Sequence, residues 1–113
     1  MPARITYQSV IEQSGIGLES LGIADIAFTR HDALQALEAL RAEERLILGG
    51  DAYSRVASKI SYAHANWYVE RRTGESDMDL LRRSWDSANR FVIEHAVEGT
   101  IEPLFSFVVE PLA

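Results

Sequence analysis

The residues that most often carry enzyme chemistry are few in this sequence and are not spaced for it. Histidine occurs only at His31, His64 and His95, outside any HxH or HExxH arrangement, so we expect no metal site. Cysteine is absent, which excludes a thiol nucleophile, a disulfide and a Cys-ligated zinc site. No GxSxG motif surrounds a serine, so a hydrolase triad has no local support. We therefore expect no catalytic residue and no cofactor.

One acid–base arrangement stays open as an alternative. Asp51 directly follows Gly49-Gly50, and it could act with Glu70 as a general acid–base pair if the fold brought the two carboxylates together. The corresponding protein would be a small cytosolic enzyme or ligand-binding domain that uses the Gly-Gly-Asp turn. This alternative predicts a concave pocket beside Asp51 with a perturbed carboxylate. A flat surface there, with Asp51 capping its own turn, would argue against it.

Three aromatic residues, Tyr53, Trp67 and Tyr68, point more specifically to a binding surface. In a strand, alternation places Trp67 and Tyr68 on opposite faces, so at least one ring should point away from the core. Exposed aromatic rings close to acids are typical of protein–protein interfaces. The alternative is that Trp67 fills the core while Tyr68 lies under a loop. The sequence leaves both arrangements open.

Five arginines lie between positions 71 and 90, but acidic residues are interspersed among them. The spacing favours ion pairs Asp79–Arg83 and Asp86–Arg90, each in the stabilising order with the acid first. A surface that binds nucleic acid needs unopposed cations interleaved with exposed aromatic rings. We therefore expect a solvated, self-paired helix face and no nucleic-acid partner. The arginines concerned are Arg71, Arg72, Arg82, Arg83 and Arg90.

The stretch Leu46–Tyr53 is expected to organise the fold. Its three aliphatic residues predict a short buried strand, and Gly49-Gly50 either adopts φ > 0 in a turn or lets the backbone press against a neighbour. A strand is expected over 23–28, and Thr29 with Asp32 forms a capping box for the helix that follows. This helix is long enough for a parallel crossover to the strand at 46–48.

The remaining elements follow from periodicity. A helix over Tyr7–Ser14 should end at Gly15 as a left-handed residue, and the longest helix should run from Ser76 to about Val97. His95, at the end of its apolar stripe, is expected to be structural, with its cation favoured by the helix dipole. Strands are expected over 66–71 and from Pro103 to Pro111, whereas 54–65 is ambiguous. The fold class is α+β: a mixed, largely antiparallel sheet of about four or five strands with two or three helices packed on one side.

Size and charge limit the range of functions. The 113 residues form one domain, with a net charge of −6. A negative field repels nucleic acid and favours encounter with a basic partner. The first residues lack the apolar run of a secretion signal, and no stretch is long and apolar enough to cross a membrane. We expect a cytoplasmic protein that does not associate with membranes.

The sequence resembles the immunity protein 40 family of bacterial polymorphic-toxin immunity proteins. Ile47–Tyr53 is similar to its Ile-Leu-Gly-Gly-Asp-Val-Tyr block, with Ala52 in place of valine, and Asn66–Tyr68 matches its Asn-Trp-Tyr block. Arg83-Ser84 and Ala88 also match, whereas Phe91-Val92 stands where Tyr-Ile is expected. The resemblance covers roughly residues 23–110. It implies an α+β domain that neutralises a toxin by binding, without cofactor or catalysis.

These observations lead to the hypothesis of an immunity protein that occludes the active site of a cognate toxin domain, helped by acid on the inhibitor meeting base on the toxin. A third possibility is a structural subunit whose Trp67/Tyr68 strand pairs with a copy of itself. The sequence does not determine the oligomeric state. The expected interface residues are Asp51, Tyr53, Tyr68 and Glu70, with Asp77 and Asp79 at the rim and Gly49 and Gly50 shaping the loop.

Overall fold

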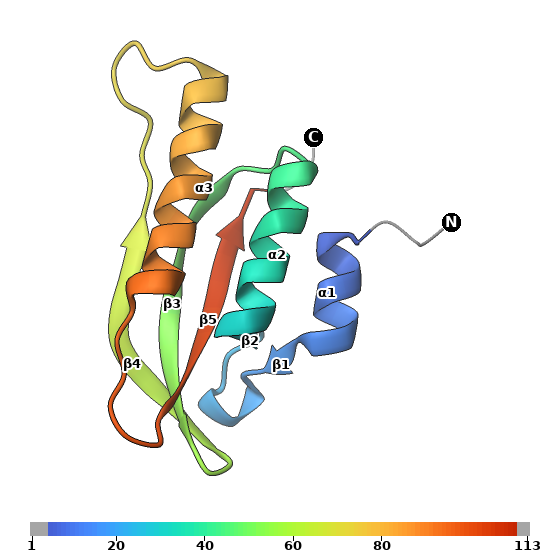
Figure 1. Cartoon of the computed structure of the whole chain (residues 1–113), viewed down its shortest axis with the longest axis vertical. Helices are drawn as coiled ribbons and strands as arrows, with labels where there is room; N and C mark the ends of the chain where they lie inside the picture. The colour runs from blue at the N-terminus through green and yellow to red at the C-terminus, as the bar shows by residue number, and fades with distance from the viewer. Residues whose placement is uncertain (1–4, 111–113) are drawn as a thin grey trace.

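A single five-stranded sheet carries the fold, with its helices arranged around it (Figure 1). The structure, a computed structural model, describes residues 5–110. The elements in chain order are α1 (Tyr7–Ser14), β1 (Ile16–Gly17), the 3-10 helix η1 (Glu19–Leu21), β2 (Ile26–Thr29), α2 (Arg30–Ala42), β3 (Ile47–Val56), β4 (Lys59–Tyr68), α3 (Asp77–Glu94) and β5 (Glu102–Val109).

The strand order is β1-β2-β5-β3-β4, and each pairing in the described chain is antiparallel. Both β2 and β3 run antiparallel to β5, so they are parallel to each other with β5 between them. The predicted strand–helix–strand crossover is therefore present, and α2 makes it. The predicted α+β class is confirmed, and the sheet, which was expected to be mixed and largely antiparallel, is an open sheet with antiparallel pairing throughout the described residues.

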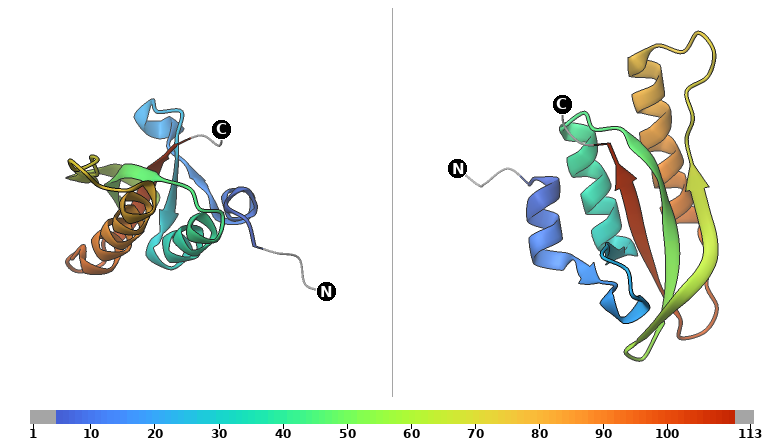
Figure 2. Two further views of the ribbon diagram at one scale, coloured as in Figure 1. Left: turned by 90° about the horizontal axis from the view of Figure 1, so that it is seen from above. Right: turned by 180° about the vertical axis from the view of Figure 1, so that it is seen from behind.

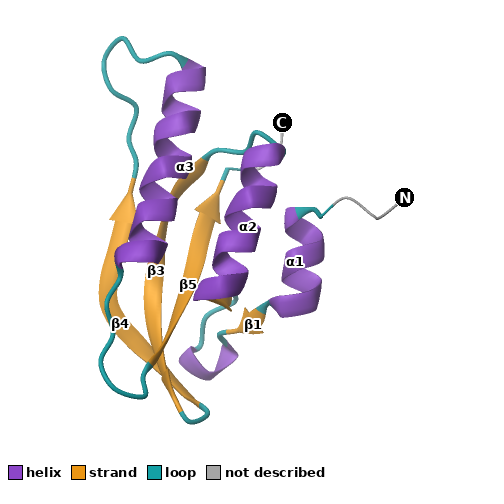
Figure 3. Cartoon of the chain, in the orientation of Figure 1, coloured by secondary structure: helices purple, strands orange, loops and turns teal. Residues whose placement is uncertain are grey.

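Helices α2 and α3 cover one face of the sheet, and α1 lies beside α2 (Figure 2, Figure 3). The core between these layers is dominated by aromatic and aliphatic side chains, among them Phe28, Leu40, Ile47, Val92 and Phe105. The 3-10 segment lies on the opposite face of the sheet, where Leu18 packs with Tyr53 and Leu104 in a second, smaller core. We call the face under α2 and α3 the inner face and the other the outer face.

The predicted helix starts are confirmed by their capping contacts. Thr29 and Ser76 accept hydrogen bonds from the backbone N–H groups of Asp32 and Asp79. The capping box at Thr29 is incomplete. The Asp32 carboxylate was expected to accept a hydrogen bond from the Thr29 backbone N–H, but it accepts one from the Thr29 hydroxyl. The third helix ends at Glu94, earlier than the expected Val97.

Several strand predictions were wrong in their limits. Residues 54–65, which the sequence left ambiguous, belong to two strands: β3 continues to Val56, the chain turns at Ala57 and Ser58, and it returns as β4. β4 ends at Tyr68, so the segment expected to extend to Arg71 is a loop from Val69 onward. The first strand of the crossover covers only Ile26–Thr29. For the last strand, Pro111, the expected end, lies outside the described residues.

Gly15 ends α1 in an extended conformation, with φ −68° and ψ 134°, not in the predicted left-handed one. A Cβ at this position would lie 2.5 Å from the carbonyl oxygen of Ile11 and 2.7 Å from a side-chain carbon of Ile26. Glycine is therefore required here by close packing between the helix end and β2. The physical reason differs from the one that the sequence suggested.

Candidate binding surface

Gly49 and Gly50 lie inside β3, so the turn predicted for them was wrong. Neither residue has a positive φ. Gly50 pairs with Trp67 of β4, and a Cβ on Gly50 would lie 2.3 Å from the indole ring. A Cβ on Gly49 would lie 2.4 Å from the Trp67 carbonyl oxygen. Of the two predicted roles, close approach of a neighbour is confirmed, whereas loop shaping is contradicted because there is no loop.

The indole that fills the space above Gly50 belongs to the inner face. Its ring centroid lies 4.5 Å from that of Phe91 on α3 and 5.9 Å from that of Phe107 on β5. Because side chains alternate along a strand, Tyr68 must then point to the outer face. It does so with 76% of its surface exposed. Trp67 is thus a core residue and Tyr68 a surface residue, which excludes the arrangement with Tyr68 covered by a loop.

The registers of the three strands place specific residues side by side on the outer face. One row across β5, β3 and β4 consists of Val108, Gly49 and Tyr68. The next row consists of Ser106, Asp51 and Asn66. We call the exposed part of these two rows, formed by Asp51, Asn66, Tyr68 and Val108, the open face. It combines an acid, an amide, an aromatic ring and an aliphatic side chain without a helix above it (Figure 2).

Tyr53 belongs to the third row, with Leu104 and Tyr62, and its prediction as an interface residue was wrong. Only 3% of its surface is exposed, because Leu18 and its neighbours cover this end of the outer face. Burial raises the pKa of Tyr53. The hydrogen bond with Ser106 lowers this pKa, whereas the negative charge of Asp51 raises it. Tyr53 is therefore part of the support beneath the open face.

A hollow of about 290 Å³ lies beside Asp51, where β4 departs from regular pairing. Its lining includes Asp51, Tyr62, His64 and Asn66. Between Ala52 and Tyr53 the register jumps, and His64 adopts φ 55°, which opens the strand locally. Tyr62, His64, Asn66 and Val108 are surface residues that were not predicted from the sequence. The period-two pattern of Tyr62, His64, Asn66 and Tyr68 was the signal that could have found the three on β4.

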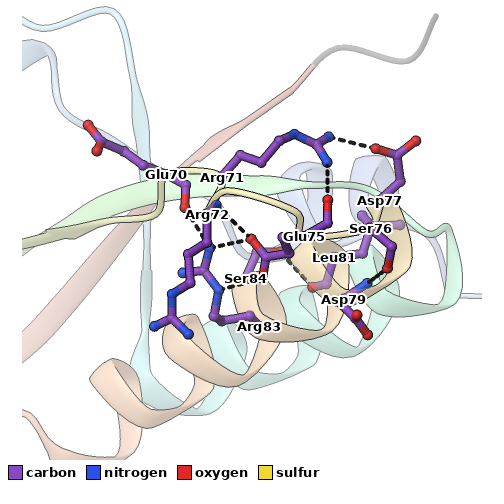
Figure 4. A network of polar contacts seen from close by, with 10 residues as sticks. All are labelled: Glu70, Arg71, Arg72, Glu75, Ser76, Asp77, Asp79, Leu81, Arg83 and Ser84. Carbon is purple, nitrogen blue, oxygen red and sulfur yellow. Dashed lines mark hydrogen bonds and ion pairs between the residues drawn. The ribbon is translucent and has the colours of Figure 1, made fainter.

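The other predicted interface residues, Glu70, Asp77 and Asp79, are exposed in the loop that joins β4 to α3 and in the first turn of α3. Figure 4 shows the side chain of Glu70 pointing away from the arginines of this loop. The carboxylate of Asp77 lies 2.6 Å from the guanidinium of Arg71. These three acids lie beyond the end of β4 and do not line the hollow.

Arg83 anchors this loop, and its partner is not the predicted Asp79. Its guanidinium donates two hydrogen bonds to the carboxylate of Glu75, at 2.8 and 2.9 Å, and a third to the Glu70 carbonyl oxygen (Figure 4). The hydrogen bonds from Arg83, followed by that from the Arg72 backbone, lower the pKa of Glu75 to about 2. Among the described residues, no ion pair joins Asp86 to Arg90 either.

Ser84, the neighbour of Arg83, is buried beneath the same helix. Its hydroxyl donates to the Leu81 carbonyl oxygen and accepts from the backbone N–H of Ile47 at 3.3 Å. The adjacent Arg83-Ser84 pair therefore attaches α3 to the loop on one side and to the start of β3 on the other. This arrangement gives a structural role to two residues of the motif noted in the sequence.

His95, the C-cap of α3, is structural in its contacts, but its pKa is lowered, contrary to the expectation that the helix dipole favours its cation. Its ring packs against Phe91 and Phe105, and burial, followed by the positive charge of Arg30, lowers the pKa of His95. Arg30 donates to the carbonyl oxygens of Val92 and His95. The end of α3 is thus satisfied by the guanidinium, which disfavours the imidazolium there.

Within 5–110, no group of three or more histidine, aspartate or glutamate side chains could hold a metal ion. In the same residues, no helix combines the length and the apolarity needed to cross a membrane.

Comparison with known proteins provides the family. No match is found among curated proteins or among solved structures. The sequence model of one family, described as immunity protein 40, matches residues 17–109. These residues include all five strands apart from the first residue of β1, together with α2 and α3, and hence the open face and the loop anchored by Arg83. The chain belongs to the immunity protein 40 family, whose members are immunity proteins against toxins.

Proposed function

We propose that this protein neutralises a cognate toxin domain by binding it through the open face and thereby blocking its active site. The observation that carries the proposal is the exposure of Tyr68 at 76% and of Val108 at 51%, on either side of Gly49, on a part of the outer face that no α-helix covers. Tyr is a frequent anchor of protein interfaces. Asp51 lies in the next row of the same face.

The charge distribution supports a basic partner. The chain carries a net charge of −6, and Glu70, Asp77 and Asp79 are exposed in the segment that follows Tyr68. Complementary charges at the rim of an interface mainly accelerate association. We assign Tyr68 and Asp51 to the centre of the interface and these three acids to its rim. Because Asp77 is paired with Arg71, it contributes less free charge than Glu70.

The experiment is co-expression with the toxin encoded by the neighbouring gene. The toxin alone should stop growth, and this chain should restore it. With an active-site variant of the toxin, purified proteins should form a stable complex, and inhibition of the active toxin should compete with its substrate. A neighbouring gene that encodes no toxin, or equal killing with and without this chain, contradicts the proposal. Inhibition that excess substrate does not relieve contradicts active-site blocking alone.

A second candidate, a ligand-binding domain or small enzyme, is favoured by the hollow beside Asp51. As predicted from the sequence, this candidate used a Gly-Gly-Asp turn and a pairing of Asp51 with Glu70. Gly49, Gly50 and Asp51 instead lie within β3, and Glu70 lies in the loop beyond β4. A binding screen with small metabolites, followed by a test for turnover, distinguishes this candidate. Turnover that is abolished by Asp51→Asn would replace the first proposal.

A further inference from the structure

The carboxylate of Asp51 stands without a partner on the outer face. It is half-buried, and among the described residues it makes neither a hydrogen bond nor an ion pair. Across the strands its neighbours are Asn66 and Ser106, which are uncharged. Removing a carboxylate from water without a partner costs free energy, so such a group binds a complementary cation more favourably than an exposed one.

The hollow next to this carboxylate has the composition of a site for an organic cation. The ring of Tyr62 forms part of its lining, and an aromatic face attracts a guanidinium or an ammonium group. Asn66 adds an amide oxygen that can accept a hydrogen bond. The lining contains no lysine or arginine that would already occupy the site. A metal ion is a poor fit, because Asp51 is the only carboxylate in this lining.

The surroundings of the hollow favour a protein side chain over a free small cation. The row formed by Val108, Gly49 and Tyr68 lies two residues earlier in β3, about 7 Å away at the rise of a strand. A partner that places a cation on Asp51 would therefore also cover the exposed Tyr68 and Val108. An arginine fits better than a lysine, since its planar fork can bond a carboxylate with two N–H groups and stack on an aromatic ring.

We propose that the hollow formed by Asp51, Tyr62, His64 and Asn66 receives an arginine side chain from the protein that docks on the open face. The inference rests on the proposed function in taking the toxin domain as the source of that arginine. It adds the chemistry of the central contact: a guanidinium held by the carboxylate of Asp51 and the ring of Tyr62, next to the exposed side chains of Tyr68 and Val108.

The hollow itself is tested without the toxin. Isotope-labelled protein is titrated with the end-blocked peptide Gly-Arg-Gly, and amide NMR shifts are followed. Residues 51 and 62–66 should shift and saturate, whereas the citrulline peptide, equal in shape but uncharged, should leave them unchanged. Asp51→Asn should abolish the shifts. The control Asp86→Asn, which removes an exposed acid beside the groove between α2 and α3, should preserve them. Absence of shifts, equal shifts with citrulline, or shifts spread over all acids would overturn the inference.

The toxin provides the second arm. Asp51→Asn should weaken binding of the inactive toxin about tenfold or more, and Asp86→Asn should not. If the toxin binds wild type and Asp51→Asn equally, the inference fails while the proposed function stands. If the peptide titration succeeds but the toxin does not bind wild type, the proposed function fails while the arginine site stands.

Discussion

The indole of Trp67 occupies the space that a side chain on Gly50 would need. The two residues pair across β3 and β4, and an added Cβ on Gly50 would lie 2.3 Å from the ring and 2.2 Å from the carbonyl oxygen of Ser106. The missing side chain thus fixes Trp67 on the inner face, against Phe91. Tyr68 is directed outward as a consequence. A packing requirement in the core therefore determines which aromatic ring is available to a partner.

Gly50→Ala should lower the free energy of unfolding by about 1–3 kcal/mol, the usual cost of overpacking a core. Chemical denaturation measures the change. The same substitution in a Trp67→Leu background should cost less by about 1 kcal/mol, because the smaller side chain leaves room for the methyl group while the contact with Ser106 remains. An equal cost in both backgrounds would show that the indole does not set the constraint.

Tyr68 and Trp67 should respond in opposite ways to truncation. Tyr68→Ala should change the free energy of unfolding by less than about 0.5 kcal/mol, since the residue is exposed, whereas Trp67→Ala should cost about 3–5 kcal/mol. In calorimetric titration with the inactive toxin, Tyr68→Ala should weaken binding about tenfold or more. Ile93→Ala, an exposed aliphatic residue on α3, is the matched control and should leave affinity unchanged. Loss of affinity in the control alone would place the interface on the helical face.

Glu75 should make stability depend on pH in an acidic window. Because its pKa falls from an ordinary value of 4.5 to about 2 in the folded protein, its ionised form stabilises the fold above pH 4.5. This contribution is lost as the pH falls from 4.5 toward 2. The difference in denaturation midpoint between wild type and Glu75→Gln should therefore shrink across this range. Glu98→Gln serves as the control for removal of an acid. If the midpoint difference between wild type and Glu75→Gln stays constant with pH, the lowered pKa of Glu75 is contradicted.

His95 should titrate below its ordinary pKa of 6.5, as followed by the NMR signals of its imidazole. A lowered pKa means that the neutral form stabilises the fold above pH 6.5 and that this stabilisation is lost as the pH falls through the folded value. Arg30→Met should raise the pKa only partly toward 6.5, since burial is the larger cause. Arg90→Met, an exposed arginine on α3, should leave it unchanged. A titration midpoint at or above pH 6.5 in wild type would instead support the expectation that the helix dipole stabilises the His95 imidazolium.

The extent to which the sequence could predict the site differs between residues. The exposure of Tyr68 depends on strand alternation and on one core aromatic beside it, and both are visible in the sequence. Tyr53 satisfies the same composition rule, an aromatic ring near an acid, yet it is buried because Leu18 packs over it from a segment far away in the chain. No local pattern carries that information. The predicted pairing of Arg83 with Asp79 was wrong for a similar reason. Arg83 reaches Glu75 in the preceding loop, and its two hydrogen bonds to that carboxylate favour Glu75 over the helical neighbour Asp79.

Local chemistry in the sequence alone determined the helix starts at Thr29 and Ser76, the parallel crossover and the α+β class, because caps and periodicity act over a few residues. The tertiary structure decided that Gly49-Gly50 is a strand and not a turn. Glycine permits both, and only the pairing of β3 with Trp67 on one side and Ser106 on the other selects the extended form. The structure also decided which side of the sheet is left uncovered. That depends on where α2, α3 and the segment around Leu18 pack, which is a property of contacts between distant parts of the chain.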